Sequence, residues 1–144
     1  MDARAAKKAP NPGANKVKHR LLASRSRIEG DGRALKRAFA TAPVPGSPHP
    51  DATAAITHLR NHLATLEAEI QHQTGGGANG KKARQLTAQT IADTRSSLAK
   101  LDAASKATDQ ATAVKLINDG MTLLQKAKKT SRQAGKSLEG AWPL

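Results

Sequence analysis

The feature that most constrains this chain is a run of large aliphatic residues spaced alternately three and four positions apart. Its members are Ile56, Leu59, Leu63, Leu66 and Ile70. In a helix this spacing places every side chain on one face and forms a seam like that of a coiled coil. The pattern therefore predicts a helix from Asp51 to about Gln73, whose seam packs on copies of the chain or on a larger partner.

A glycine-rich stretch follows this helix and allows the chain to reverse direction. Four glycines, Gly75, Gly76, Gly77 and Gly80, occur within six residues. Beyond them the same spacing continues at Ile91, Thr94, Leu98 and Leu101. We therefore expect residues 51–74 and 81–104 to form an antiparallel helical hairpin, the most secure part of the core.

The last part of the chain carries small and aliphatic residues in heptad register. They are Ala113, Ile117, Gly120, Leu124, Ala127, Ser131, Ala134 and Leu138. Residues 103–110 include no proline or glycine, so residues 81–138 could form one long helix or two. We favour a turn near Thr108 and Asp109, because the hydrophobic register shifts there and the helix over 51–73 is too short to cover so long a rod.

The N-terminal region begins with basic residues that lack any apolar periodicity. Residues 1–15 are rich in Ala, Lys, Pro and Asn, a composition typical of a flexible arm. From Asn15, the expected N-cap, a first helix is indicated by spacings of four, three and four. The residues at these spacings are Val17, Leu21, Ser24 and Ile28.

Two glycines make the end of this first helix ambiguous. Asp31 lies between Gly30 and Gly32 and could cap a continuation that carries Leu35 and Phe39. Because glycine weakens a helix interior, the pattern is consistent with one bent helix or two short ones.

Together these patterns predict an all-α protein, an antiparallel helical hairpin or bundle with coiled-coil-like seams. Four prolines between residues 43 and 50 remove backbone donors and predict a stiff linker. The expected organisation is a flexible basic arm (1–15), a basic helical segment (16–42), the Pro-rich linker (43–50), the helical hairpin or bundle (51–138) and a C-terminal tail (139–144). In that tail we expect Trp142 to cover the end of the bundle or to insert into a partner's pocket.

The chain has few large apolar residues with which to build a core. Leu, Ile, Val and Phe make up 23 of its 144 residues, and its net charge is +13. Chains of this composition often fail to fold alone, although abundant Ala favours helices. We therefore expect burial to be completed in a homo-oligomer or a larger assembly. Without an apolar run long enough for a membrane span or a secretion signal, we expect an intracellular location or a place within a particle.

Positive charge is concentrated in two clusters. The first forty residues contain eleven Lys and Arg against three Asp and Glu, and five more bases lie between residues 126 and 136. Such an excess attracts polyanions and is typical of nucleic-acid binding. The residues expected to contact phosphates are Lys16, Lys18, Arg20, Arg25, Arg27, Arg33, Lys36, Arg37, Lys81, Lys82, Lys126, Lys128, Lys129 and Arg132. With only two aromatic residues in the chain, stacking on bases is not expected.

Two short motifs suggest chemistry that the rest of the sequence does not support. Gly75 to Lys81 match the first seven positions of a phosphate-binding loop, but Lys82 stands where a magnesium-binding Ser or Thr is needed, and no strand is predicted before it. His58 and His62 share a helix face, as in some metal sites, but a metalloprotease needs a Glu after the first His. We therefore expect no catalytic residues, cofactor, metal or small-molecule substrate.

The sequence thus favours a non-enzymatic helical protein that contacts the phosphate backbone of nucleic acid and packs on itself or within a larger complex. A virion or phage-like particle component or a nucleoid-type protein would have these properties. The alternative is an adaptor that docks on an acidic protein partner without nucleic acid. Binding to DNA that weakens steeply with salt would support the first hypothesis.

Overall fold

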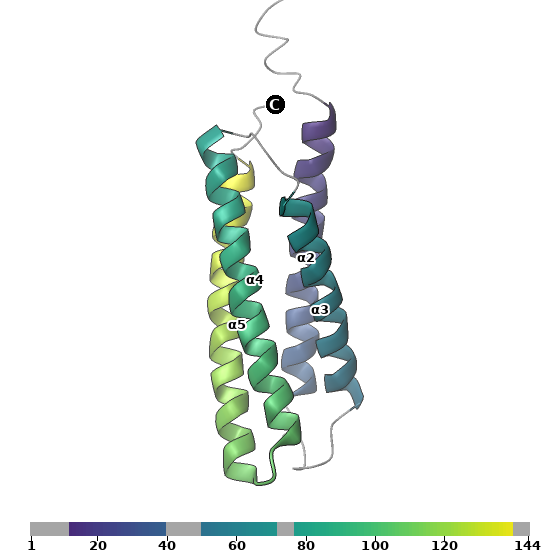
Figure 1. The fold of residues 1–144 in the computed structure, drawn as a ribbon, viewed down its shortest axis with the longest axis vertical. Coiled ribbons are helices and arrows are strands. Elements are labelled where there is room, and N and C mark those ends of the chain that lie inside the picture. Colours follow the sequence, from purple (N-terminus) through teal and green to yellow (C-terminus); the bar gives the residue numbers. More distant parts are fainter. Residues whose placement is uncertain (1–11, 40–49, 72–76, 140–144) are drawn as a thin grey trace, which may run out of the picture.

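The computed structural model describes residues 12–39, 50–71 and 77–139, and almost all of these are helical (Figure 1). The helices are α2 (Pro12–Ala38), α3 (Pro50–Gln71), α4 (Gly77–Lys106) and α5 (Gln110–Glu139). Consecutive helices run in opposite directions, so α2 and α4 begin at one end of the bundle and α3 and α5 begin at the other (Figure 1). The prediction of an all-α antiparallel bundle is confirmed.

The four helices form a ring in which, among the described residues, backbones approach closely only between neighbours. The most extensive contact is between α4 and α5, followed by α2 with α3, and the two pairs meet along α3–α4 and α2–α5. The predicted hairpin of α3 and α4 therefore exists as one side of the ring, but it is not the closest pairing. Residues distant in sequence, in α2 and α5, lie side by side.

Helix α2 is longer and more regular than expected. It is one continuous helix that passes through Gly30 and Gly32. It begins at Pro12. Proline is favourable at the start of a helix because it has no backbone N–H group, and the N–H groups of the first helical residues have no carbonyl partner within the helix. The prediction that Asn15 caps this helix is therefore wrong, and residues 12–15 are helical. Residues 1–11, the linker before Pro50 and the tail with Trp142 lie outside the described residues.

The chain reverses between α4 and α5 at the place that the register shift indicated. Residues 107–109 are not helical, and Asp109 caps α5. Its carboxylate accepts hydrogen bonds from the Thr112 backbone N–H at 2.8 Å and from the Thr112 hydroxyl at 2.7 Å. These two bonds, led by the backbone one, hold the pKa of the Asp109 carboxyl below its ordinary value. The cap stabilises the first turn of α5.

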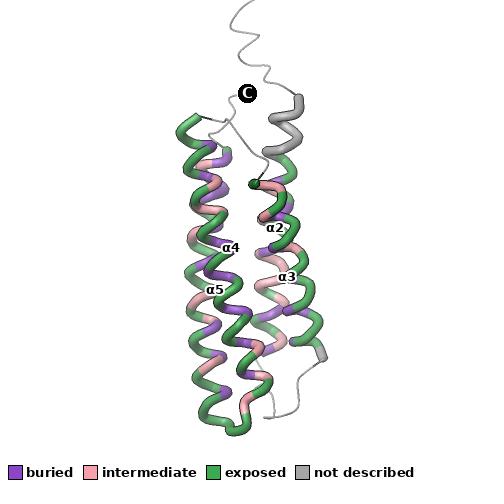
Figure 2. Tube along the Cα trace, viewed as in Figure 1, coloured by how far each residue is buried: buried purple, intermediate pink, exposed green. Residues whose placement is uncertain are grey.

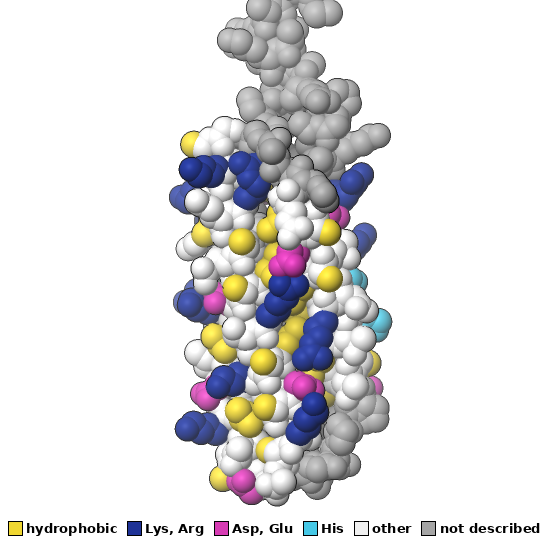
Figure 3. Space-filling model, viewed as in Figure 1, with side chains coloured by type: hydrophobic (Ala, Val, Ile, Leu, Met, Phe, Trp, Pro, Cys, Tyr) yellow, Lys and Arg dark blue, Asp and Glu magenta, His cyan; other side chains and the backbone are white. Residues whose placement is uncertain are grey.

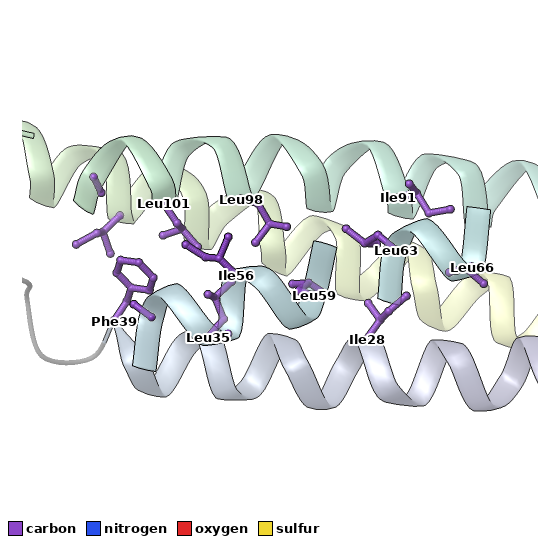
Figure 4. Packing of buried hydrophobic residues seen from close by; sticks show 14 of the residues in the cluster. Ile28, Leu35, Phe39, Ile56, Leu59, Leu63, Leu66, Ile91, Leu98 and Leu101 are labelled. Carbon is purple, nitrogen blue, oxygen red and sulfur yellow. The ribbon is translucent and has the colours of Figure 1, made fainter. Parts of the chain in front are cut away.

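The core is formed by all four helices of this one chain. Buried positions line the sides of the helices that face one another (Figure 2). Leu35 of α2 lies among residues of α3 and α4, including Ile56 and Leu98, and Phe39 closes one end of the row (Figure 4). The basic helix α2 is thus an integral part of the bundle, and it packs against the aliphatic seam of α3.

The aliphatic seam of α3 is buried inside the chain. Leu59 and Leu63 have no exposed surface, Ile56 and Leu66 are almost as buried, and Ile70 packs partly buried against them. These five residues, expected to pack on a copy of the chain or on a larger partner, are thus covered by other helices of the same chain. Among the described residues, Val114 is the one large apolar side chain that is clearly exposed.

Small residues explain how the chain forms a core with so few large apolar side chains. Ala and Gly occupy many core positions, such as Ala104, Ala113 and Gly120, and they allow α4 and α5 to approach closely. A Cβ atom built on Gly120 would lie 2.9 Å from Leu101, which is shorter than any normal contact. Close approach leaves less space for side chains to fill, so the low aliphatic content does not prevent a core.

Candidate nucleic-acid interface

The two basic clusters of the sequence meet because α2 and α5 are neighbours. Helix α2 contains eight Lys and Arg against two Asp and Glu, and α5 contains six against two. Helix α3, on the far side of α2, contains one base against three acids. Helix α4 contains six bases against two acids, as α5 does, so α3 is the one acidic helix and the largest excess of positive charge lies along α2.

The α2 cluster is divided between two flanks of the helix. Arg20 and Arg27 share a helical stripe with Ser24, whose hydroxyl donates to Glu69 of α3 at 2.9 Å. These two arginines are exposed and lie on the flank toward the acidic helix α3. Arg33 and Lys36 lie on the other flank, because both line a groove shared with α5.

The α5 cluster is divided in the same way. Lys128 lines the groove opposite Arg33 and Lys36, and Arg132 lies one turn further along the same stripe. Lys126 points to the opposite flank, where its Nζ atom is 3.9 Å from the Asp93 carboxylate of α4. Lys129, also predicted as a phosphate contact, is exposed beside Lys128.

We define the basic face as Arg33 and Lys36 of α2 together with Lys128 and Arg132 of α5. All four are exposed, and none of them forms an ion pair with another described residue. The acidic residue within this face, Glu29, is bound by Arg25 at 2.8 Å. The field of the four cations is therefore not cancelled locally.

The side of the bundle formed by α3 and α4 has a different charge pattern. There several Lys and Arg lie beside Asp and Glu along the middle of the visible surface, whereas those near its upper end have no acidic side chain beside them (Figure 3). Arg95 binds Glu67 at 2.5 Å, and Asp102 lies 3.2 Å from Lys106 and 4.0 Å from Arg60. Charges that pair in this way contribute little to long-range attraction of a polyanion.

The remaining predicted contacts lie away from the basic face or only at its margin. Lys16 and Lys18 are in the first turns of α2, where the backbone alone is described, and Arg37 is exposed on its last turn. Lys81 and Lys82 are exposed near the start of α4. The four residues of the basic face are thus separated in the structure from other cations that lie close to them in the sequence.

Two sequence motifs have structural explanations. Helix α4 already begins at Gly77, whose φ is +67°, so much of the segment resembling a phosphate-binding loop is helical. His62 Nδ1 bonds to the Asp31 carboxylate and joins α3 to α2, whereas His58 is exposed. No group of three or more potential metal-ligating His, Cys, Asp or Glu side chains occurs within the described residues.

Comparison with family models, with curated proteins and with solved structures gave no match. In the described ranges, no helix is both long and apolar enough to cross a bilayer.

Proposed function

We propose that this protein is a non-enzymatic helical protein that binds the phosphate backbone of nucleic acid through its α2–α5 side. The observation that supports the proposal is the basic face, four exposed and unpaired cations on two adjacent helices. A row of separate cations suits the regularly spaced phosphates of a nucleic-acid backbone. Each contact between a cation and a phosphate releases condensed counterions, which favours binding.

The expected mode of binding is electrostatic and independent of sequence. Lysines and arginines of the face contact phosphates, which position a protein on nucleic acid without reading bases. Phe39, one of the two aromatic residues, is buried and cannot stack on a base. Such binding suits a protein that coats or packages nucleic acid within an assembly.

The test is a measurement of affinity for a fluorescent DNA duplex at several salt concentrations. The informative variant replaces Arg33, Lys36, Lys128 and Arg132 with Gln. Each lost phosphate contact should lower the slope of log affinity against log salt by about 0.9, so the slope should fall by about 3 to 4 if all four bind. Circular dichroism should be unchanged, because all four side chains are exposed.

A charge-matched control distinguishes the basic face from net charge. Replacing Lys81, Lys82, Lys100 and Lys115 with Gln removes the same charge from exposed positions outside the face. This control should lose much less affinity than the α2–α5 variant. Equal losses would show that net charge alone drives binding, and absence of DNA binding by the unmodified protein would favour the acidic protein partner.

A further inference from the structure

A groove of about 150 Å³ lies between α2 and α5, in the middle of the basic face. Its walls are formed by apolar side chains, its floor by two threonines of α4, and its rim by cations. These residues are Ile28, Met121, Leu124 and Ala127 in the walls, Thr90 and Thr94 in the floor, and Arg33, Lys36 and Lys128 on the rim. A cavity of this volume can hold an apolar group the size of a benzene ring.

One polar group lining the groove has no partner in the described structure. The hydroxyls of Thr90 and Thr94 donate to backbone carbonyls one turn earlier in α4, at 2.8 Å and 2.7 Å. Ser131 also lines the groove and is only 3% exposed, yet its Oγ atom forms no hydrogen bond. Buried hydroxyls are normally paired, and the Ser131 Oγ itself has almost no accessible surface, so it can donate to a ligand once its side chain turns toward the groove.

Gly32 leaves the groove open without being required by packing. A Cβ atom at this position would lie 3.8 Å from the nearest Leu124 carbon, an ordinary contact distance. An alanine would therefore fit, and it would favour the helix more than glycine does. By contrast, a Cβ at Gly120 would come within 2.9 Å of Leu101. Gly32 is thus a destabilising residue whose effect is to preserve space in the groove.

We propose that this groove binds a small amphipathic anion, a medium-chain carboxylate, with its alkyl chain between α2 and α5. The carboxylate pairs with Lys128 and accepts a hydrogen bond from the Ser131 hydroxyl, three residues further along α5. The chain extends toward Leu124 and Met121. Glu29, the acidic residue of the lining, does not oppose the carboxylate strongly, because it is already bound by Arg25 at 2.8 Å.

The shape of the groove favours a linear chain. Its α5 residues extend from Met121 to Ser131, about 15 Å at a rise of 1.5 Å per residue. Aliphatic walls along two adjacent helices suit an alkyl chain, and the cationic rim selects an anion over a neutral molecule of the same length.

The test is a titration with octanoate, observed through the methyl groups of ¹³C-labelled methionine. The chain has two methionines, so Met121 reports on the groove and Met1 serves as an internal reference. We expect a saturable shift of the Met121 signal. Ser131→Ala should weaken binding about tenfold, and Lys128→Gln about two- to fivefold. Octanamide, the neutral analogue, should bind more weakly than octanoate.

A matched pair of glycine variants identifies the site. Gly32→Leu places a side chain in the groove and should abolish the saturable shift. Gly30→Leu adds the same side chain two residues away, where a Cβ meets only the end of Arg33 at 3.8 Å, and should leave binding intact. The proposal would be overturned if Met121 showed no saturable shift, if Gly32→Leu bound octanoate normally, or if octanamide bound equally well. This result does not depend on whether the protein binds DNA.

Discussion

Helix α5 packs against its two neighbours in different ways. Against α4 the contact is close: a Cβ at Gly120 would collide with Leu101, and the Ser97 hydroxyl donates to the Gly120 carbonyl at 2.7 Å. Against α2 the helices leave a groove beside Gly32. Gly120 of α5 thus allows a close approach, whereas Gly32 of α2 leaves a space unfilled. Further along the α2–α5 contact the approach is close again, because a Cβ at Gly135 would lie 2.9 Å from Arg25.

The difference indicates a division between stability and binding. The α4–α5 contact is buried and closely packed, so changes there should alter the free energy of unfolding. Beside Gly32 the α2–α5 contact is open and bordered by unpaired cations, so changes at this groove should alter ligand binding and leave the fold intact. The predictions below test this division.

The largest effect is expected for Leu101→Ala. Leu101 is fully buried against Gly120, and its removal leaves a cavity between α4 and α5. The free energy of unfolding, measured in urea, should fall by about 2–5 kcal/mol. A loss well below about 1 kcal/mol would mean that the α4–α5 contact tolerates a gap as the α2–α5 contact does.

The next effect is expected for Gly120→Ala. The added methyl group must displace Leu101, which costs about 1–3 kcal/mol, while alanine returns up to about 1 kcal/mol of helix propensity. The net loss should be about 1–2 kcal/mol in the same urea assay. Because the clash involves Leu101, the loss should disappear when Leu101→Ala is already present. An undiminished loss in the double variant would show that the clash lies elsewhere.

A smaller effect of opposite sign is expected for Gly32→Ala. Its methyl group meets Leu124 at an ordinary distance, so helix propensity should raise the free energy of unfolding by about 0.5–1 kcal/mol. Gly30→Ala is the control outside the groove and should be similarly stabilising. Destabilisation by Gly32→Ala alone would show that α2 and α5 are as closely packed there as α4 and α5 are at Gly120.

The smallest effect is expected at the N-terminal cap of α5, the helix that forms both the α4–α5 and the α2–α5 contact. The pKa of Asp109 is lower in the folded protein than its ordinary value of 3.8, so its contribution is present above that pH and disappears as the pH falls toward the lowered pKa. Asp109→Ala should therefore be less stable than the unmodified protein at pH 7, and the difference should shrink in acid. A difference that is constant with pH would show that the carboxylate charge plays no part.

The spacing of aliphatic residues predicted the helices well because it reflects the helical repeat itself. The seam from Ile56 to Ile70 correctly located α3, and the register shift near Asp109 correctly separated α4 from α5. The pattern could not show what covers the seam. A low count of aliphatic residues suggested a second molecule, but α2 covers the seam through Leu35, and small residues bring the other helices close.

The candidate site was predictable only as a set of residue types. The sequence identified both basic clusters, yet it grouped Arg20 with Arg33 and Lys126 with Lys128. Members of each pair point to different flanks of one helix, and the fold places one flank toward an acidic neighbour. Gly32 and Ser131 were noted as a helix-weakening residue and a heptad position, and nothing in the sequence indicated that they line one groove.

By itself the sequence determined the helical class, the approximate helix boundaries and the excess of positive charge, because each depends on residues close together along the chain. Only the tertiary structure decided which helices are neighbours. That arrangement depends on how closely small residues allow helices to approach, which is a property of two surfaces meeting and not of either alone. It places α5 against both α4 and α2, and so creates both the closely packed contact and the open basic groove.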